Sequence, residues 1–193
     1  PRTTRGELNE AGRKLGAVQR GLFETYRGLM TGKGSGADSR SQGMKALQLL
    51  AQLEQTLDAA EVDSYEVWAV RHQWRRFLRE SKMLMEILGR WRESFPEIEQ
   101  LDLNKLLPNL AAMCSELEMR FGQIQGMLTG EAPAQALQPI TLAIDKVELA
   151  ARSHFERAAL AVTKTQLDRL EMLSRGLFDC ISYIKKNGRQ SQT

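Results

Sequence analysis

The sequence predicts an all-α protein: an antiparallel up-and-down bundle of about six helices, with a long central third helix, in a single domain spanning residues 1–193. The composition favours helix, because unbranched side chains lose little rotamer freedom there and the chain has only five prolines. Apolar residues recur at steps of three and four, the period of an amphipathic helix. A hydrophobic content of 42% is enough to bury a core, which excludes a disordered tail.

The first helix is expected over residues 5–30. Thr4 and Glu7 have the spacing of a capping box, in which each side chain binds the other's free backbone N–H. The glycine- and serine-rich stretch 32–43 then predicts a flexible loop, and it lacks the spacing and the preceding strand of a phosphate-binding loop. The apolar stripe of the helix consists of Leu8, Ala11, Leu15, Val18, Leu22 and Leu29.

The second and third helices are predicted from two further stripes. Residues 42–60 form the second helix, Asp63 or Ser64 caps the third, and Pro96 stops it. The third stripe keeps its steps of three and four for about four heptads, so this helix is expected to be the spine of the bundle. The expected buried positions are Leu47, Leu50, Leu53 and Leu57 in the second helix, and Val67, Val70, Trp74, Phe77, Ser81, Leu84, Leu88, Trp91 and Phe95 in the third.

The second half of the chain is predicted to hold three more helices. The fourth begins after the region of Asp102 and ends at Gly130. The run without breakers after Pro139 is too long for one ordinary helix, so a capping pattern at Thr165 and Asp168 indicates a joint there; a single bent helix is the alternative. The expected buried positions are Leu103, Leu106, Leu110, Met113, Leu117, Ile124 and Leu128 in the fourth helix, Ile140, Ile144, Val147, Ala151, Phe155 and Ala158 in the fifth, and Leu170, Leu173, Leu177, Cys180 and Ile184 in the sixth.

One short stretch of the chain occurs twice. Residues 27–32, RGLMTG, return as residues 125–130, QGMLTG. In both copies a helix meets Thr and then a glycine that can close a C-cap. The match indicates either a duplicated three-helix unit, residues 1–95 and 103–187, or the same helix-ending chemistry used twice.

No constellation of catalytic residues is readable, so the chain is predicted not to be an enzyme and to hold no cofactor and no metal. The histidines His72 and His154 and the cysteines Cys114 and Cys180 are too few and too scattered for a structural zinc site. Both cysteines fall in apolar helical patterns, as small core residues do. Two cysteines exclude a disulfide scaffold and favour a reducing compartment.

Cationic residues gather along one flank of the predicted third helix, where they are a candidate contact for an anion or an acidic partner. The alternative is a set of ordinary surface ion pairs, such as Arg76 with Glu80, in which case the neighbouring Trp68 and Trp74 belong to the core. No nucleic acid partner is expected, because the middle of the chain is acidic and carries no recognition motif. The candidate contact residues are Arg71, Arg75, Arg79 and Lys82.

The charge of the chain is unevenly placed. Residues 1–33 carry +4 and the tail after Ile184 carries +3, so in a chain of net charge +3 the residues between them carry −4. Basic ends around an acidic middle are typical of a cytoplasmic domain held between membrane spans, and also of ordinary solvated helix termini. No apolar run reaches the roughly 18 residues of a span. Because the chain begins with Pro1 and not with Met, we expect it to be a segment excised from a longer protein.

Two stretches are similar to a known protein family. Residues 2–5, RTTR, enter residues 15–26, LGAVQRGLFETY, and residues 59–65, AAEVDSY, open into the third helix. Together they resemble the soluble helical domain of the fusaric acid resistance and aromatic acid exporter proteins, the FUSC family. In that family the domain lies between two groups of membrane helices. The transport residues lie chiefly in the membrane part, so no functional residue carries over to a position in this chain.

The resemblance implies a cytoplasmic regulatory or assembly domain of an integral membrane exporter of aromatic acids or related compounds. It also implies protein partners or self-association, and membrane proximity through flanking segments. The alternative is a freestanding cytosolic adaptor that binds a partner in a groove between its own helices. Six helices agree with the first hypothesis, because an even number of passes returns the chain to the end of the bundle where it started.

Overall fold

The computed structural model describes residues 4–30, 37–133 and 135–190 of the chain. Every regular element in these ranges is a helix, which confirms the all-α class. The side chain of Thr4, and with it the predicted capping box, lies outside what is described. The helices are α1 (Thr4–Met30), α2 (Ala37–Asp63), α3 (Tyr65–Ala69), α4 (Arg71–Ile98), α5 (Leu103–Leu106), α6 (Leu110–Leu128), α7 (Lys146–Ala150) and α8 (His154–Gln190).

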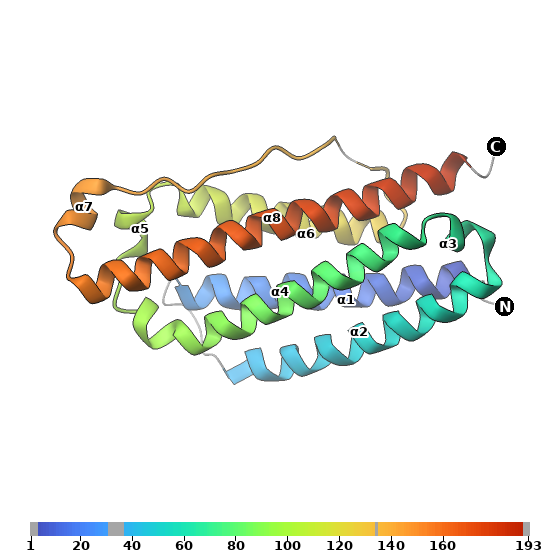
Figure 1. The fold of residues 1–193 in the computed structure, drawn as a ribbon, viewed down its shortest axis with the longest axis horizontal. Coiled ribbons are helices and arrows are strands. Elements are labelled where there is room, and N and C mark those ends of the chain that lie inside the picture. The colour runs from blue at the N-terminus through green and yellow to red at the C-terminus, as the bar shows by residue number, and fades with distance from the viewer. Residues whose placement is uncertain (1–3, 31–36, 134, 191–193) are drawn as a thin grey trace.

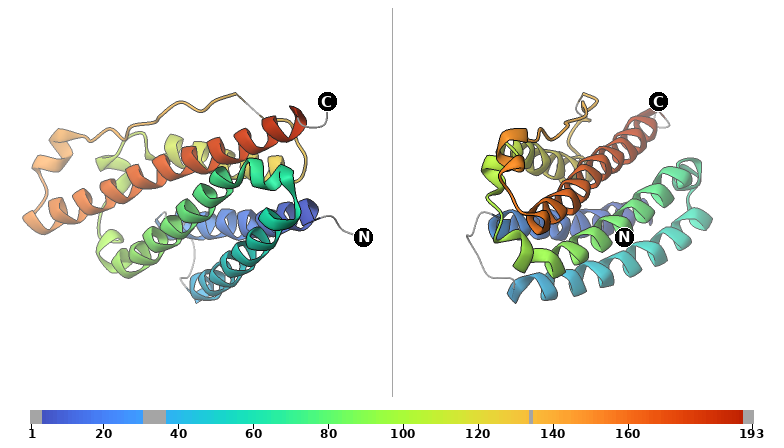
Figure 2. Two further views of the ribbon diagram at one scale, coloured as in Figure 1. Left: turned by 45° about the vertical axis from the view of Figure 1, so that its right-hand side comes forward. Right: turned by 60° about the vertical axis from the view of Figure 1, so that its left-hand side comes forward.

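The long helices α1, α2, α4, α6 and α8 pass back and forth along one axis of an elongated bundle (Figure 1). Helix α1 packs against α2, α4 and α6, and α8 packs against α4 and α6. Between α6 and α8 the chain returns along the bundle as an extended segment, which supplies the sixth pass. Both ends of the described chain therefore lie at one end of the bundle, as the other views also show (Figure 2).

The predicted stripes of α1, α4 and α6 and of the second half of α8 form the core, apart from Leu29, whose side chain lies outside what is described. Trp74 and Trp91 are its largest members, at 2% and 0% exposure. In α2 and α3, two residues expected in the core are not there: Leu47 is 60% exposed and Trp68 is 46% exposed. Leu47 borders a groove between α2 and α4, and Trp68 lies in the short helix α3 at the end of the bundle. Cys114 and Cys180 are free and buried, as expected.

The predicted third helix is in fact two helices, because the chain breaks at Val70, with φ −113° and ψ 18°, between α3 and α4. Ser64 caps α3 as expected: its Oγ accepts from the N–H of Val67 at 3.4 Å. Pro96 does not stop α4, since the N–H of Glu99 still donates to the carbonyl of Phe95 at 2.9 Å. A proline in the last turn removes one hydrogen bond where few remain to be lost.

The flexible loop predicted over residues 32–43 is wrong for its second part, because residues 37–43 begin α2. Residues 31–36 lie outside the described part of the chain. One contact joins the first turns of α2 to α1: Thr25 Oγ1 donates to Gln42 Oε1 at 3.0 Å. Packing of this kind overrides the local preference that the composition expresses.

The predicted fifth helix is wrong. Residues 131–145, described except at residue 134, form no helix and run extended along the bundle; we call them the strap. Pro133 and Pro139 each lack the backbone N–H that a helix interior needs. Val147 and Phe155, which were expected in the core, are 82% and 86% exposed. Ile140 and Ile144, expected in the same helix, lie in the strap and pack partly buried against the core.

The predicted joint near Thr165 is also wrong, and the alternative of one helix holds for the whole of His154–Gln190. Within it Thr163 Oγ1 donates to the carbonyl of Ala159 at 2.8 Å, and Thr165 Oγ1 donates to the carbonyl of Ala161 at 2.9 Å. These bonds to the preceding turn place both threonines in a helix interior. A threonine hydroxyl can cap a helix or donate to a carbonyl of the preceding turn. The spacing of Thr165 and Asp168 therefore does not distinguish a helix start from a helix interior.

Gly130, at φ 109°, follows the end of α6 in the backbone conformation that its expected C-capping role requires. The duplication of residues 1–95 and 103–187 stays a prediction. Phe23 and Phe121, which align at the offset of the repeated stretch, pack together with their ring centroids 5.6 Å apart.

Candidate functional site

The cationic flank predicted on the third helix turns largely towards carboxylates of α2. Arg75 Nη2 lies 2.5 Å from Asp58 Oδ1, and Arg75 Nε lies 3.0 Å from Glu61 Oε1. Hydrogen bonds to Glu61 and Asp58 raise the pKa of Arg75 above its ordinary value. Lys82 Nζ lies 3.3 Å from Glu54 Oε2. These contacts fasten α4 to α2, so Arg75 and Lys82 already have anionic neighbours within the chain.

The other two members of the flank lie apart from those pairs. Arg71 donates through Nη1 to the carbonyl of Trp68 at 2.8 Å, and its guanidinium carbon lies 4.0 Å from the centre of the Trp68 ring. Arg79 is exposed on α4, and the expected pair of Arg76 with Glu80 forms at 3.2 Å. The four predicted residues thus occupy different settings along the helix.

A groove of about 680 Å³ runs between α2 and α4, with α1 beneath it; we call it the α2/α4 groove. Its floor is apolar and buried, with Leu22 and Tyr26 from α1, Leu50 from α2 and Leu88 from α4. Met44 and Leu47 form one wall and are 66% and 60% exposed, and Met85 lies on the opposite side. Such a set of exposed apolar side chains beside a concave surface is typical of a binding site.

Charged side chains mark the two ends of this groove. The ion pair of Lys82 with Glu54 lies across one end. Arg40 on α2 and Arg92 on α4 line the other end, with Glu86 between. From Arg40 to Glu54 the axis of α2 covers about 21 Å at about 1.5 Å per residue, which is the length of about four helical turns.

Sequence reasoning missed this groove, although one signal for it was available. The apolar stripe of the second helix begins with Leu47, while the rest of that stripe is buried against other helices. Hydrophobic periodicity records which face of a helix is apolar and does not record what covers that face. A residue that the pattern places in the core and the fold leaves exposed is therefore the useful signal.

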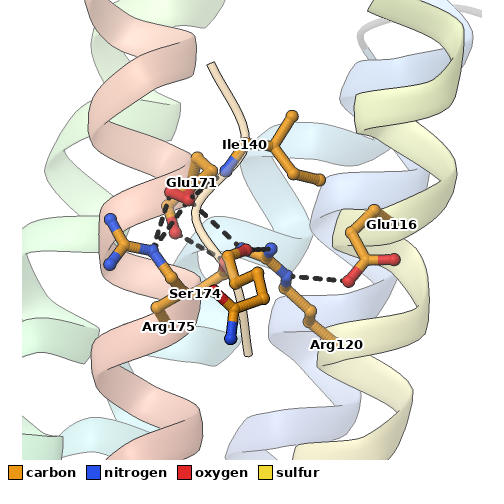
Figure 3. Close-up of polar contacts among 7 residues, drawn as sticks. Glu116, Arg120, Ile140, Glu171, Ser174 and Arg175 are labelled. Carbon is orange, nitrogen blue, oxygen red and sulfur yellow. Dashed lines mark hydrogen bonds and ion pairs between the residues drawn. The ribbon is translucent and has the colours of Figure 1, made fainter. Parts of the chain in front are cut away.

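A second seam, between α6 and α8, is closed by a buried polar network (Figure 3). Arg120 on α6 has no exposed surface. Its Nη1 donates to Ser174 Oγ at 3.1 Å and its Nη2 donates to the carbonyl of Gln138 in the strap at 2.7 Å. Its Nε lies 3.3 Å from Glu116 Oε1, and its Nη1 lies 3.5 Å from Glu171 Oε1.

Glu171 on α8 completes the hold on the strap. Its Oε1 accepts from the backbone N–H of Ile140 at 3.0 Å and from Arg175 Nε at 2.7 Å. Arg120 thus binds a carbonyl of the strap, and Glu171 binds a backbone N–H of the strap at Ile140 (Figure 3). The polar groups of Arg120 and Glu171 bond within the chain, so this part of the network serves structure.

Asn109 and Leu142 hold the next part of the strap. Asn109 Nδ2 donates to the carbonyl of Thr141 at 2.9 Å, and Asn109 Oδ1 accepts from the N–H of Ala143 at 2.8 Å. Leu142, between them, is only 3% exposed. The strap therefore buries its own apolar side chain in the core and satisfies its backbone through side chains of the bundle.

Other reactive groups offer little chemistry. Burial raises the pKa of the Cys114 thiol to about 11 and that of Cys180 to about 12, so both stay protonated near neutral pH. Across the ranges that the structure describes, no three His, Cys, Asp or Glu side chains gather as metal ligands would. In the same ranges, none of the helices has both the length and the apolar character that crossing a bilayer demands.

Comparison of the chain with protein-family models, with curated proteins and with solved structures found no match in any of the three. The similarity to exporter domains therefore rests on the quoted stretches of sequence alone. Function has to be argued from the α2/α4 groove and from the layout of the bundle.

Proposed function

We propose that this chain is a protein-interaction domain that holds an amphipathic helix of a partner in the α2/α4 groove, and that it acts as the regulatory or assembly domain of a membrane exporter. The observation that carries the proposal is that the groove is apolar and exposed and that no described residue covers it, while the chain covers its other seam with its own strap. An amphipathic helix laid in a groove is a recurrent mode of recognition.

The chemistry of the groove describes the partner segment. Covering Met44 and Leu47 removes apolar surface from water, which is favourable by about 25 cal/mol per Å². Apolar side chains at steps of three and four along the partner helix fit the floor formed by Leu22 and Leu50. Arg40 and Arg92 at the open end favour a carboxylate on the partner near that end.

A designed peptide tests the groove directly. The probe is a fluorescent amphipathic helix of about 14 residues with Leu at helical spacing and Glu at one end, titrated into the chain and followed by anisotropy. We expect saturable binding to the wild type and at least about tenfold weaker binding to the Leu47→Glu variant. Met172→Glu is the matched control, because Met172 is 62% exposed on α8, far from the groove residues in sequence. Equal binding by both variants would remove the groove from the proposal.

The membrane setting rests on the layout of the chain. The described part begins and ends at one end of the bundle, as an insertion between membrane segments requires (Figure 1). The two basic ends of the sequence agree with the cytoplasmic side. Fractionation of cells that express the full-length parent, followed by protease treatment from outside, tests this setting. A membrane-bound parent with this domain protected supports the exporter domain, and a parent found wholly in the cytosol supports the freestanding adaptor.

A further inference from the structure

An apolar tip projects from the end of the bundle where the described chain begins and ends. It consists of Val62 at the end of α2 with Tyr65 and Trp68 of α3, which are 85%, 78% and 46% exposed. The Tyr65 and Trp68 rings stack with centroids 5.9 Å apart. Helix α3 lies beside the N- and C-terminal ends in Figure 1. Large apolar side chains gathered on an exposed turn usually mark a contact surface.

Cations lie close to this tip. The Arg71 guanidinium sits over the Trp68 ring with its carbon 4.0 Å from the ring centre. Arg5 at the start of α1 also lies near the tip. Its Nη1 is 2.6 Å from Oε2 of Glu66 in α3, and this ion pair connects the two helices. The aromatic surface is therefore bordered by the guanidinium group of Arg71, which lies over the Trp68 ring, while Arg5 is paired with Glu66.

The end of α8 adds a partly buried ammonium group. Lys185 Nζ donates to the neutral Asn9 Oδ1 at 3.0 Å, and among the described residues no carboxylate is within ion-pair distance of it. Burial, and secondarily the nearby Arg5, lower the pKa of Lys185 to about 8. Lys185 shares a small cleft with Arg5, Glu66 and Val67, beside the aromatic tip. Glu66 is paired with Arg5 in this cleft, so an anion outside the chain would supply a counter-charge for Lys185.

The net charge of this end is close to zero. Arg75 is shared by Glu61 and Asp58, so these three groups together carry one negative charge. The remaining described charges are four cations against three carboxylates: Arg5, Arg71, Lys185 and Lys186, and Glu7, Asp63 and Glu66. Attraction to an anionic surface therefore depends on the cations that lie beside the exposed rings, and not on the net charge of this end.

We propose that this end of the bundle docks on an anionic membrane surface, with Tyr65 and Trp68 in the interfacial layer and Arg71 and Lys185 facing the lipid headgroups. Tyrosine and tryptophan favour the boundary between headgroups and acyl chains, because each has an apolar ring and a polar group. Lysine and arginine near an anionic leaflet gain further attraction. The inference rests on the membrane setting of the proposed function and adds the surface that meets the lipid; it needs neither a partner helix nor the α2/α4 groove.

Vesicle binding by the 193-residue chain tests the proposal. The chain is sedimented with vesicles of phosphatidylcholine alone and of phosphatidylcholine with about 30% phosphatidylserine. We expect binding to the anionic vesicles that is at least about tenfold stronger than binding to the neutral ones, and weaker in about 0.5 M salt. Trp68 should report it by a blue shift of fluorescence, because Trp74 and Trp91 are already buried. Absence of binding, or equal binding to both kinds of vesicle, overturns the proposal.

A matched pair of variants locates the contact. Tyr65→Ser combined with Trp68→Ser should weaken binding to anionic vesicles at least about tenfold, while Met172→Ser, at a similarly exposed site on α8, should leave it unchanged. Helical circular dichroism checks that both variants are folded. Unchanged vesicle binding by the double variant overturns the proposal. So does a double variant that dissociates an oligomer of the wild type, since a second copy would then cover the tip.

The two proposals fail separately. Leu47→Glu, which should lose the helical peptide, lies in the groove and should bind anionic vesicles as the wild type does. Loss of vesicle binding in the double tip variant should leave peptide binding intact.

Discussion

The α6/α8 seam and the α2/α4 groove differ in whether the chain covers them. Between α6 and α8 the chain lays its own strap, buries Leu142 and fixes the strap backbone to Arg120 and Glu171. Between α2 and α4 it leaves Met44 and Leu47 exposed over an apolar floor. The apolar surface buried in the covered seam stabilises the fold. The apolar surface left exposed in the groove can be buried only by another molecule, which favours binding.

The polar side chains of the covered seam are buried, and those of the groove are exposed. Arg120 and Glu171 are almost without exposed surface, and their partners are groups of the same chain. In the groove the ion pair of Lys82 with Glu54 lies at the rim, where both side chains are close to half exposed. A buried network fixes one arrangement, while exposed rim pairs rearrange at little cost. The groove is thus the more adaptable of the two surfaces.

The largest effect is expected from breaking the covered seam. Arg120→Met leaves Glu171 with one cation fewer in a buried site and removes the donor to the Gln138 carbonyl, so the free energy of unfolding should fall by about 3 to 5 kcal/mol. Urea unfolding followed by circular dichroism measures it. Arg169→Met, at an exposed site on α8, should change stability by less than about 0.5 kcal/mol. Similar losses in both variants would mean that Arg120 does not lock the strap.

A smaller effect is expected from the apolar anchor of the strap. Leu142→Ala should lower the free energy of unfolding by about 2 kcal/mol, because Leu142 is 3% exposed and the truncation leaves a cavity. Hydrogen exchange should show faster exchange at the N–H groups of Ile140 and Ala143, which bond to side chains of the bundle. A variant as stable as the wild type would show that the strap packs loosely.

The partly buried Lys185 should make the stability of the chain depend on pH. Lys185 contacts a neutral amide, and its pKa is lowered from 10.5 to about 8. Between these values the unfolded chain binds the proton that the folded chain has lost, so this residue makes stability rise with pH from about 8 to 10.5. Below pH 8 both states are protonated and the full cost of burying the charge remains.

The Lys185→Met variant isolates this contribution. It should be more stable than the wild type near neutral pH, and the difference should shrink as the pH rises towards 10.5. Lys186→Met, at the exposed neighbouring position, should show no such trend. A constant difference across this range would mean that the Lys185 ammonium is not penalised in the folded chain.

The smallest effect on stability is expected in the groove. Met44→Ser combined with Leu47→Ser should change the free energy of unfolding by less than about 0.5 kcal/mol, because both side chains are mostly exposed. The same variant should bind the helical peptide at least about tenfold more weakly. Urea unfolding and anisotropy measure the two quantities on one sample. A large loss of stability would show that these residues belong to the core after all.

The sequence pattern predicts much of the bundle, and the predictions that are wrong share one physical cause. Stripes such as Trp74 to Trp91 read correctly because helix burial has a period that the residues reveal. The strap was taken for a helix, since an extended chain held by Asn109, Arg120 and Glu171 depends on residues distant in sequence. The groove was missed for a related reason, because the exposure of Leu47 depends on where α4 lies. Local pattern carries neither kind of information.

The contrast between the seams is tested most directly by the reactivity of cysteines placed in each. Leu47→Cys and Leu142→Cys are treated separately with a maleimide, and the buried native thiols, with raised pKa values, give a slow background. We predict that the thiol at position 47 reacts at least about a hundredfold faster than the thiol at position 142, and that the helical peptide slows only the first. Equal rates at the two positions, or a slow reaction at position 47 without peptide, would contradict the account.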